Sequence, residues 1–516
     1  MKLLSLFVLI SIISSLCVCH TLLPQPKSIS VGTDSVVVDS NFNIDATGPG
    51  AQSQILKDRI EEYKSLFFLY PSEEPVEPTD ALSSLTVDVQ SAEENLILNS
   101  DESYTLSVEN AKSASLSSNT IWGALRGLET FSQLIVYNYS TTSYSIPELP
   151  ILINDAPRFP WRGVMLDTAR HFYPVKTIKE FIRTMSFSKF NTFHWHAIDA
   201  QSFPFEIKKY PLLAEKGAYC PWCIYTQTEI KDVITFAKGY GIRVVIEFDG
   251  PGHAAAIGKG YKELVANCPN YEHNINNIPL DPTQQFTYDV VNDMWTEMSE
   301  LIEDRYIHYG GDEVVQNCWN EDSKIKQWME DNNMNTGDLN SYYFEKLSTI
   351  AKDLNLQMVV WEEVFDLKNH DFLTNAIVQV WRDSATLKGV VEAKIKALLS
   401  YGWYLDRQSP DSKSHYEWID TWQDMYNNEP FDGITSGTEY ILGGEAAMWS
   451  EQVFPTSLQT RVWPRACAIG ERLWSQKDVT DISDAKIRIN QHSCRLSQRD
   501  IPTSPLYPGF CFTGKP

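Results

Sequence analysis

The sequence predicts an α/β protein in which a closed (β/α)8 TIM barrel follows a small α+β domain. Short apolar segments alternate with helical stretches from Trp161 onward, and about eight such units favour a closed parallel barrel. Polar and aromatic residues follow each segment, as they do at the strand ends where barrel enzymes build their sites. An open doubly wound sheet is the alternative, but no Gly-rich phosphate loop follows the first segment.

The part of the chain before the barrel divides in two. Residues 1–19 are typical of a secretory signal, because Lys2 precedes an apolar run too short to span a bilayer comfortably. Cleavage is expected near Cys19 or His20, and an uncleaved anchor is the alternative. Residues 20–155 are expected to form the α+β domain. Its expected strands are 35–38, 85–89, 104–108 and 144–147, and its expected helices are 51–67 and 120–136.

The barrel is expected at residues 156–490, after an exit linker at 154–160 that contains two prolines. A short C-terminal tail, 491–516, completes the chain and carries neither an ER-retention signal nor a lipid-anchor pattern. No segment after the signal is long and apolar enough to span a membrane. The expected barrel strands are 163–166, 192–197, 243–248, 306–309, 358–361, 377–381, 397–400 and 440–443.

Composition narrows the class of protein. A formal charge of −24 leaves no basic footprint for nucleic acid. Such an acidic chain repels itself less where carboxylates begin to protonate, which fits an acidic compartment. The chain has 15 Trp and 24 Tyr, and planar apolar faces suit the binding of sugars. Asn138 heads the glycosylation sequon Asn-Tyr-Ser.

Seven cysteines remain once the signal is removed, and this odd count predicts three bridges and one free thiol in an oxidising compartment. Cys220 and Cys223 have thioredoxin-like spacing without a thioredoxin pattern around them, so a loop staple is expected there. Cys467 lies in an apolar helical stretch and is expected to be the buried free thiol.

The clearest candidate for chemistry is the acid pair Asp312-Glu313, which follows an apolar run and two glycines. Neighbouring side chains of a strand point to opposite faces, so both acids enter one pocket only if the backbone bends there. Glycines permit such a bend. A carboxyl group in an apolar pocket has its pKa raised and can serve as a general acid. A solvated acidic turn is the alternative.

Adjacent acids do not suit the usual retaining mechanism, in which two carboxylates flank the scissile bond about 5 Å apart. They suit a division of labour in which one acid protonates the leaving oxygen and the other orients a nucleophile carried by the substrate. The chain resembles the β-N-acetylhexosaminidases of glycoside hydrolase family 20, the group that contains the lysosomal hexosaminidases. The residues that carry the resemblance are 163–171, 194–199, 309–313, 403–406, 443–451 and 463–474.

This resemblance implies substrate-assisted retention and a role for each of several residues. Glu313 would be the general acid and then the base, Asp312 would orient the 2-acetamido group, and Tyr404 would hydrogen-bond its oxygen. The other implied pocket residues are Trp361, Trp381 and Trp449 around the sugar, Arg170, Asp406 and Glu451 on its hydroxyls, and Asp199 and His253 behind the acid pair. Two family bridges, Cys268/Cys318 and Cys494/Cys511, are also implied. No metal and no cofactor are implied.

Several of these residues have simpler interpretations. Arg170 could pair with a barrel carboxylate, and Glu362 and Glu363 could belong to a solvated loop. His194 and His196 could be core histidines and are left outside the site, and Trp463 and Trp474 are expected in the core.

The chain departs from the family pattern in places. Asp406-Arg407 mixes two family variants, since Asp406 disfavours a 6-sulfated sugar and Arg407 favours one. Neutral substrates are therefore expected to be preferred. Ala200 stands where relatives often carry Asp, the family's N-terminal bridge is missing, and Cys220/Cys223 is a local addition.

The leading hypothesis is a lysosomal or secreted exo-enzyme that releases terminal β-linked N-acetylglucosamine or N-acetylgalactosamine from glycoprotein glycans, chitin fragments or glycolipids. A lectin on an inactive hydrolase scaffold is the alternative from another class, but such a protein could lose Glu313, which this chain keeps. A chitin-chain hydrolase would carry a spaced Asp-x-Asp-x-Glu run, which is missing. Family members are often dimers, so a homodimer is expected, with no nucleic acid partner and no stable membrane anchor.

Overall fold

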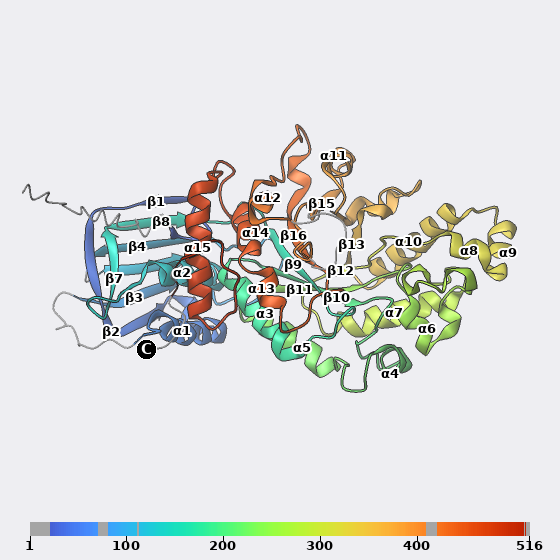
Figure 1. Ribbon diagram of the computed structural model, residues 1–516, viewed down its shortest axis with the longest axis horizontal. Helices are drawn as coiled ribbons and strands as arrows, with labels where there is room; N and C mark the ends of the chain where they lie inside the picture. The colour runs from blue at the N-terminus through green and yellow to red at the C-terminus, as the bar shows by residue number, and fades with distance from the viewer. Residues whose placement is uncertain (1–20, 71–80, 111–112, 409–419, 510, 512–516) are drawn as a thin grey trace, which may run out of the picture.

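The computed structural model describes residues 21–70, 81–110, 113–408, 420–509 and 511. The segment expected to be a signal lies outside the described residues. Among those described, no helix combines the length and apolarity that crossing a membrane requires. The chain forms an N-terminal domain with one mixed sheet and a closed barrel beside it (Figure 1).

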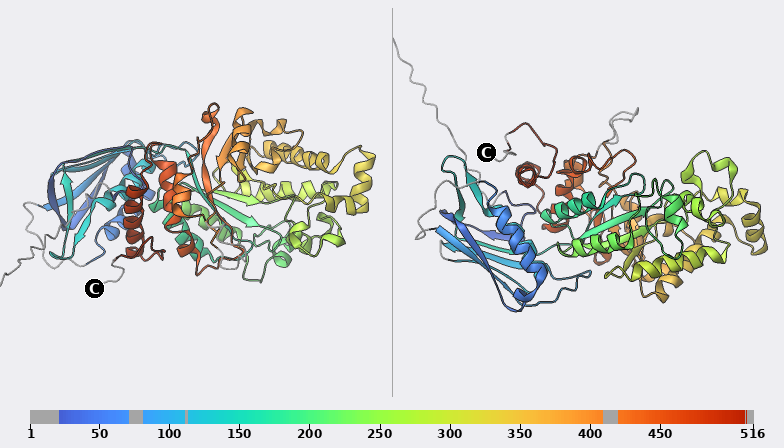
Figure 2. Two further views of the ribbon diagram at one scale, coloured as in Figure 1. Left: turned by 45° about the horizontal axis from the view of Figure 1, so that its top comes forward. Right: turned by 90° about the horizontal axis from the view of Figure 1, so that it is seen from below.

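The N-terminal domain is an eight-stranded sheet in the order β1-β8-β4-β5-β3-β2-β7-β6. Helices α1 (Gln54–Phe67) and α2 (Ile121–Leu134) pack on it (Figure 2). Each begins at a hydroxyl that caps it, Ser53 accepting from the Leu56 amide and Thr120 from the Gly123 amide. The strands are β1 (Ser28–Ser30), β2 (Asp34–Thr47), β3 (Ala81–Val89), β4 (Tyr104–Asn110), β5 (Ser113–Ser118), β6 (Val136–Asn138), β7 (Ser143–Leu149) and β8 (Ile151–Asp155).

Four of these strands, β1, β5, β6 and β8, are missing from the sequence-based expectation. β5 is mostly serine, and β1 and β6 have only three residues each, so none carries a long apolar alternation. β8 runs into the expected linker, because it pairs with β1 and β4 up to Asp155.

The barrel closes in the order β9 to β16, and every neighbouring pair is parallel. All eight strands expected from the sequence are present. They are β9 (Trp161–Asp167), β10 (Thr192–Ile198), β11 (Arg243–Phe248), β12 (Tyr306–His308), β13 (Gln357–Trp361), β14 (Ile377–Val380), β15 (Lys396–Leu399) and β16 (Ile441–Met448). The fold class predicted from the sequence is confirmed.

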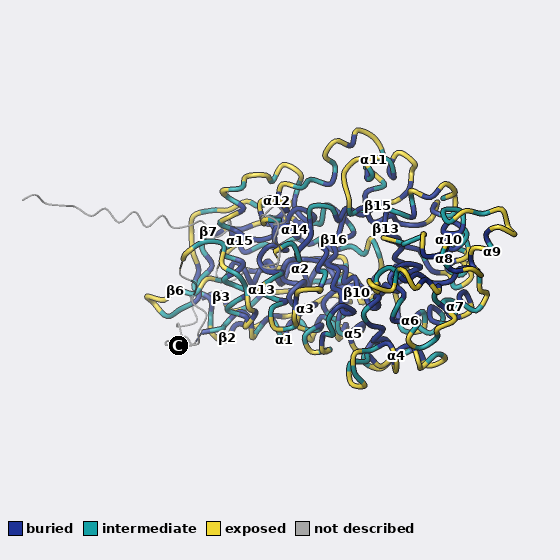
Figure 3. The backbone as a smooth tube through the Cα atoms, turned by 45° about the vertical axis from the view of Figure 1, so that its right-hand side comes forward, coloured by how far each residue is buried: buried dark blue, intermediate teal, exposed yellow. Residues whose placement is uncertain are grey.

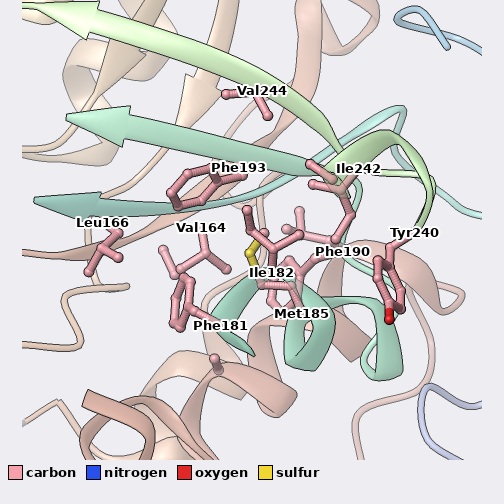
Figure 4. Packing of buried hydrophobic residues seen from close by; sticks show 14 of the residues in the cluster. Val164, Leu166, Phe181, Ile182, Met185, Phe190, Phe193, Tyr240, Ile242 and Val244 are labelled. Carbon is pink, nitrogen blue, oxygen red and sulfur yellow. The ribbon is translucent and has the colours of Figure 1, made fainter. Parts of the chain in front are cut away.

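Helices cover the outside of the barrel, so its strands are buried on both faces (Figure 3). In Figure 4, Phe181, Ile182 and Met185 of α3 pack against Val164 of β9 and Phe193 of β10. The helices from here to the C-terminus are α3 (Val175–Phe187), α4 (Leu212–Gly217), α5 (Gln227–Lys238), α6 (Ala255–Gly260), α7 (Gln285–Ser299), α8 (Asn317–Glu321), α9 (Ser323–Asp331), α10 (Thr336–Asp353), α11 (Ser384–Glu392), α12 (Trp422–Asn427), α13 (Leu458–Val462), α14 (Arg465–Trp474) and α15 (Ile482–Gln498).

The last strand and the C-terminal region differ from expectation. β16 extends to Met448, so Glu445 lies inside the barrel rather than in the loop after the strand. Helix α15 spans the position at which the sequence suggested that the barrel ends. It lies beside the N-terminal domain (Figure 1), where Arg499 pairs with Glu129 of α2 at 2.9 Å.

A buried carboxylate joins the two domains. Glu102 precedes β4 and pairs with Arg126 of α2 at 2.8 Å and with Arg162 of β9 at 2.7 Å. Burial alone raises the pKa of the Glu102 carboxyl, but the two guanidinium groups outweigh burial and lower it. The stabilisation is therefore complete above the ordinary pKa of a glutamate and is lost as the pH falls through the lowered value.

Replacing Glu102 with Ala should lower the free energy of unfolding by about 3–5 kcal/mol, because it leaves two buried guanidinium groups without a carboxylate. Denaturant unfolding at pH 7 measures this loss. Glu61→Ala is the control, since Glu61 forms an exposed pair with Lys64 and its loss should cost within about 0.5 kcal/mol. Equal losses in the two variants would contradict the assignment.

Candidate functional site

A pocket of about 380 Å³ opens among the loops that follow the barrel strands. This volume is typical of sites for small molecules. Every pocket residue expected from the sequence lines it except Asp199, which lies directly behind. The lining residues are Arg170, His253, Asp312, Glu313, Trp361, Trp381, Tyr404, Asp406, Trp449, Glu451, Gln452 and Val453. Of these, Gln452 and Val453 carry no motif by which the sequence could have revealed them.

The backbone bends sharply at the acid pair. Gly310, Gly311 and Glu313 have φ values of 67°, 110° and 50°, all in the region that glycine favours. A Cβ atom at Gly310 would lie 1.7 Å from Oδ1 of Asp249, and the same oxygen accepts the Gly311 amide at 3.1 Å. This turn lets both adjacent acids reach one pocket, as the sequence analysis required.

The two acids have opposite environments. Asp312 is 8% exposed, and burial first, then the nearby Asp249, raises its pKa well above the ordinary value. The Glu313 side chain is 62% exposed, and Nε2 of His253 lies 3.6 Å from its Oε2. The interaction with His253 lowers the pKa of Glu313. The raised carboxyl pKa expected for an apolar pocket is therefore found at Asp312 and not at Glu313, because Glu313 lies at the open mouth beside a cation.

His253 is charged because carboxylates surround it. Burial alone lowers its pKa, but Asp199 and Asp249 raise it well above the ordinary value. Its Nδ1 lies 2.8 Å from Oδ2 of Asp249 and 3.7 Å from Oδ2 of Asp199. Asp199 in turn contacts Nε2 of His196 at 3.0 Å. His196 is a buried histidine, as expected, and also connects the site to the barrel interior.

Arg170 combines the two roles considered from the sequence. Its Nη2 pairs with Asp199 at 2.9 Å, and its Nε donates to Gln201 at 3.2 Å. Its guanidinium also lies over Trp449, with Cζ 4.8 Å from the ring centroid, and lines the pocket. The ion pair with Asp199 thus holds Arg170 in a fixed position, from which its remaining N–H donors can bind a ligand.

Aromatic rings form the walls. The ring centroids of Trp361 and Trp449 are 6.0 Å apart, and those of Trp381 and Tyr404 are 6.5 Å apart. Trp361 donates its indole N–H to Glu247 at 2.8 Å. This anchoring fixes the walls before any ligand arrives.

Glu362 and Glu363 do not form a solvated loop. Glu362 is fully buried and accepts the Trp381 amide at 3.1 Å. Glu363 accepts the Trp381 indole N–H at 3.0 Å, and burial raises the pKa of Glu363 to about 7. The sequence analysis did not predict that Glu362 and Glu363 hold Trp381 in place, although two acids directly after Trp361 were a signal.

Asp406 and Glu451 lie close together at one side of the pocket. Burial first, and then the neighbouring Glu451 carboxylate, raises the pKa of Asp406 to about 7. The guanidinium of Arg407 lies over the Tyr404 ring, with Cζ 4.5 Å from the centroid, and its Nη1 is 3.6 Å from Oδ2 of Asp420.

Three groups of described histidine and acidic side chains have donor atoms within 4.8 Å of one another: His194/Glu247/His308, Asp199/Asp249/His253 and His253/Asp312/Glu313. In each group an imidazole already faces a carboxylate, for example His308 Nδ1 and Glu247 at 3.1 Å. Hydrogen bonding and charge pairing therefore account for these groups without an ion.

The cysteines pair as Cys220–Cys223, Cys268–Cys318 and Cys494–Cys511, and Cys467 is free and buried. Trp463 and Trp474 are fully buried, as expected. Asn138 is exposed at the end of β6, so its predicted glycosylation is sterically reasonable.

Replacing His253 with Gln should raise the pKa of Glu313, because it removes the cation that stabilises the carboxylate. Titration of ¹³C-labelled glutamate measures this shift, with the Glu313 signal assigned by its loss in Glu313→Gln. His171→Gln is the matched control, since His171 bonds to the Ser450 carbonyl at 2.5 Å. An unchanged Glu313 titration in His253→Gln would contradict the inferred charge on His253.

Comparisons with known proteins agree with this geometry. A family model described as "Glycosyl hydrolase family 20, catalytic domain" matches residues 159–477, and one described as "beta-acetyl hexosaminidase like" matches residues 22–134. Beta-hexosaminidase subunit A1 of Dictyostelium discoideum is 43% identical over 508 residues, covering 96% of this chain and 92% of that protein. Beta-hexosaminidase subunit beta of Homo sapiens is 42% identical over 422 residues, covering 80% and 74%.

Among solved structures, the chitobiase of Flavobacterium johnsoniae superposes with a TM-score of 0.81 and 29% identity, covering 93% of this chain and 73% of that one. The barrel, the N-terminal domain and the acid pair thus lie in a framework shared with these proteins. The chain belongs to glycosyl hydrolase family 20.

Proposed function

We propose that this protein releases terminal, non-reducing β-linked N-acetylglucosamine or N-acetylgalactosamine from glycans with retention, using the acetamido group of the substrate as nucleophile. One observation carries the proposal. Within the described chain, Oδ1 of Asp312 is buried without a hydrogen-bond partner, beside an exposed second acid, Glu313. A buried acceptor without a partner is costly unless a ligand supplies the donor, and the acetamido N–H is such a donor.

The first step breaks the bond between C1 and the glycosidic oxygen. Glu313 gives its proton to that oxygen while the acetamido oxygen attacks C1, which forms an oxazolinium ion and releases the aglycone. Asp312 holds the acetamido N–H and stabilises the positive charge, and the Tyr404 hydroxyl hydrogen-bonds the acetamido oxygen. Because the charge develops in the transition state, these fixed groups accelerate the chemistry more than they tighten ground-state binding.

The second step uses the same residues. Glu313, now a carboxylate, takes a proton from water as the water oxygen attacks C1 and the ring of the oxazolinium opens. The two inversions at C1 give net retention. In this scheme Asp199 and His253 position Glu313.

The rest of the pocket selects the sugar. Trp361, Trp381 and Trp449 enclose its ring, and Arg170, Asp406 and Glu451 bind its outer hydroxyls. Substrate binding also removes water from Glu313, which raises the pKa of the acid toward the range in which it is protonated.

The cellular setting follows from the same proposal. The apolar N-terminal segment, the Asn138 sequon and three disulfides support entry into the secretory route, with the lysosome or the outside as destination. The low pH of a lysosome would keep a larger fraction of Glu313 protonated. A homodimer with the strand-end face near its interface is also proposed.

Glu313→Gln should lower kcat/KM for an aryl β-N-acetylglucosaminide by about a hundredfold to ten-thousandfold, because it removes the proton donor. Assays from pH 3 to pH 8 compare it with wild type, whose activity should peak in acid. Glu263→Gln, an exposed glutamate outside the pocket, is the control. Wild type that binds the sugar without cleaving it would instead favour a lectin, and equal activity in Glu313→Gln would mean that another acid acts.

The preference for neutral over 6-sulfated sugars should rise as the pH passes through about 7, because only ionised Asp406 repels a sulfate and its pKa is raised to about 7. The ratio of kcat/KM for neutral and 6-sulfated aryl glycosides, measured from pH 5 to pH 8, tests this. Asp406→Asn should remove the pH dependence of the ratio. A preference for the sulfated sugar at every pH would disprove the role of Asp406.

A further inference from the structure

The exposed large apolar side chains of the barrel gather on one part of its rim. Among the described barrel residues these are Leu212, Tyr219, Trp222, Ile275 and Phe454. All of them lie in the connections that follow β10, β11 and β16. In the barrel order β16-β9-β10-β11, the connections after β10 and β11 are neighbours, and the connection after β9 separates them from the one after β16. A clustered set of exposed apolar groups indicates a contact surface.

Trp222 is the most exposed of them, at 81%. It lies in the turn Cys220-Pro221-Trp222-Cys223, which is closed by a disulfide and by the Cys223 amide donating to the Cys220 carbonyl at 2.9 Å. Proline fixes φ at the second position of such a turn, and the disulfide removes further freedom. The indole is therefore held out in water rather than left free to fold back on the protein.

The turn is tied to the pocket. Tyr219, directly before it, donates its hydroxyl to the Arg170 carbonyl at 2.9 Å. Arg170 lines the pocket and lies close enough to Glu313 to lower the pKa of that acid. A charge interaction thus links the acid at the mouth to Arg170, and a hydrogen bond links Arg170 to Tyr219 beside the Trp222 turn.

Neighbouring connections complete this part of the rim. Gln201 joins the connection after β10 to the one after β11, where it donates to Asn276 at 2.9 Å. Phe454 follows the pocket residue Val453 directly, and its ring lies 4.7 Å from that of His171. In Figure 1 the helices α4 and α6, which belong to the connections after β10 and β11, lie side by side at the end of the barrel away from the N-terminal domain.

A pocket of about 380 Å³ has room for little more than one sugar ring. The remainder of a longer glycan must therefore lie across the rim of the pocket. Aromatic faces are suited to the CH faces of sugars, and Tyr219 and Trp222 supply two exposed rings there.

We propose that Tyr219 and Trp222, on the disulfide-closed turn, form an additional carbohydrate subsite that binds sugars of the glycan beyond the residue being released. This inference rests on the proposed exo-glycosidase function and extends it to the aglycone side. The subsite favours longer oligosaccharides over one-sugar substrates.

The test compares two substrates of wild type and Trp222→Ala: an aryl β-N-acetylglucosaminide, which has one sugar, and a β-1,4-linked N-acetylglucosamine tetramer. The ratio of kcat/KM for the tetramer to that for the aryl substrate should fall about fivefold to tenfold in Trp222→Ala, as expected for the loss of one aromatic contact. The change should arise mainly in KM. Trp222→Phe should restore most of the ratio.

Two further variants sharpen the test. Cys220→Ser/Cys223→Ser frees the turn but keeps the indole, so the ratio should fall by a smaller factor. Leu152→Ala removes an apolar side chain that is 43% exposed on β8, and the ratio should stay at the wild-type value.

An unchanged ratio in Trp222→Ala overturns the subsite. So does a change in oligomeric state of that variant in sedimentation velocity, because the turn would then be a contact between copies of the chain. If wild type cleaves neither substrate, the proposed function fails independently. Calorimetric binding of the tetramer, weakened about fivefold to tenfold in Trp222→Ala, would still support the subsite, and equal binding would reject it.

Discussion

A single buried carboxylate, Glu247 of β11, connects the strands on which the pocket is built. Its Oε2 lies 2.5 Å from Nδ1 of His196 and 3.0 Å from Nε2 of His194, and its Oε1 accepts the Trp361 indole at 2.8 Å and faces His308 at 3.1 Å. A carboxylate this deeply buried is tolerated only while it is paired. The four partners lie on β10, β12 and β13, so keeping Glu247 satisfied also keeps these strands in register.

The charge arrangement extends from Glu247 to the reacting groups. His196 contacts Asp199, which helps to keep His253 protonated, and His253 faces Glu313. Asp312 lacks a cation in direct contact among the described residues and is buried, so its pKa is raised while that of its neighbour is lowered. Two adjacent carboxyl groups thus receive different acidities from their surroundings. In the proposed mechanism, loss of water around Glu313 on substrate binding then raises the pKa of this acid.

Stability and chemistry are concentrated at different ends of the barrel. The Glu102 pairs join the N-terminal domain to the start of β9, where helix α2 also reaches the barrel through Arg126 and the Gly241 carbonyl at 2.8 Å. The pocket and its rim lie at the opposite ends of the strands. Loops on that face can vary without disturbing the domain junction.

The sequence by itself determined the barrel, its eight strands, the acid pair and most of the pocket lining. These depend on local patterns: apolar runs mark the strands, and parallel strands deliver whatever follows them to one face. The serine-rich β5 and the other short strands were not predicted, because their pairing partners, rather than their own residues, stabilise them. The full length of β16, and with it the position of Glu445 inside the barrel, could not be predicted from the sequence for the same reason.

Only the tertiary structure decided the acidities and the supporting contacts. Glu363 holds Trp381, and His253 lies beside Glu313, across 18 and 60 residues of sequence. A pKa depends on burial and on charges within a few ångströms, whichever part of the chain supplies them. Residue types therefore revealed which groups can react, whereas the folded arrangement determined which of the two acids stays ionised and which is shielded from water.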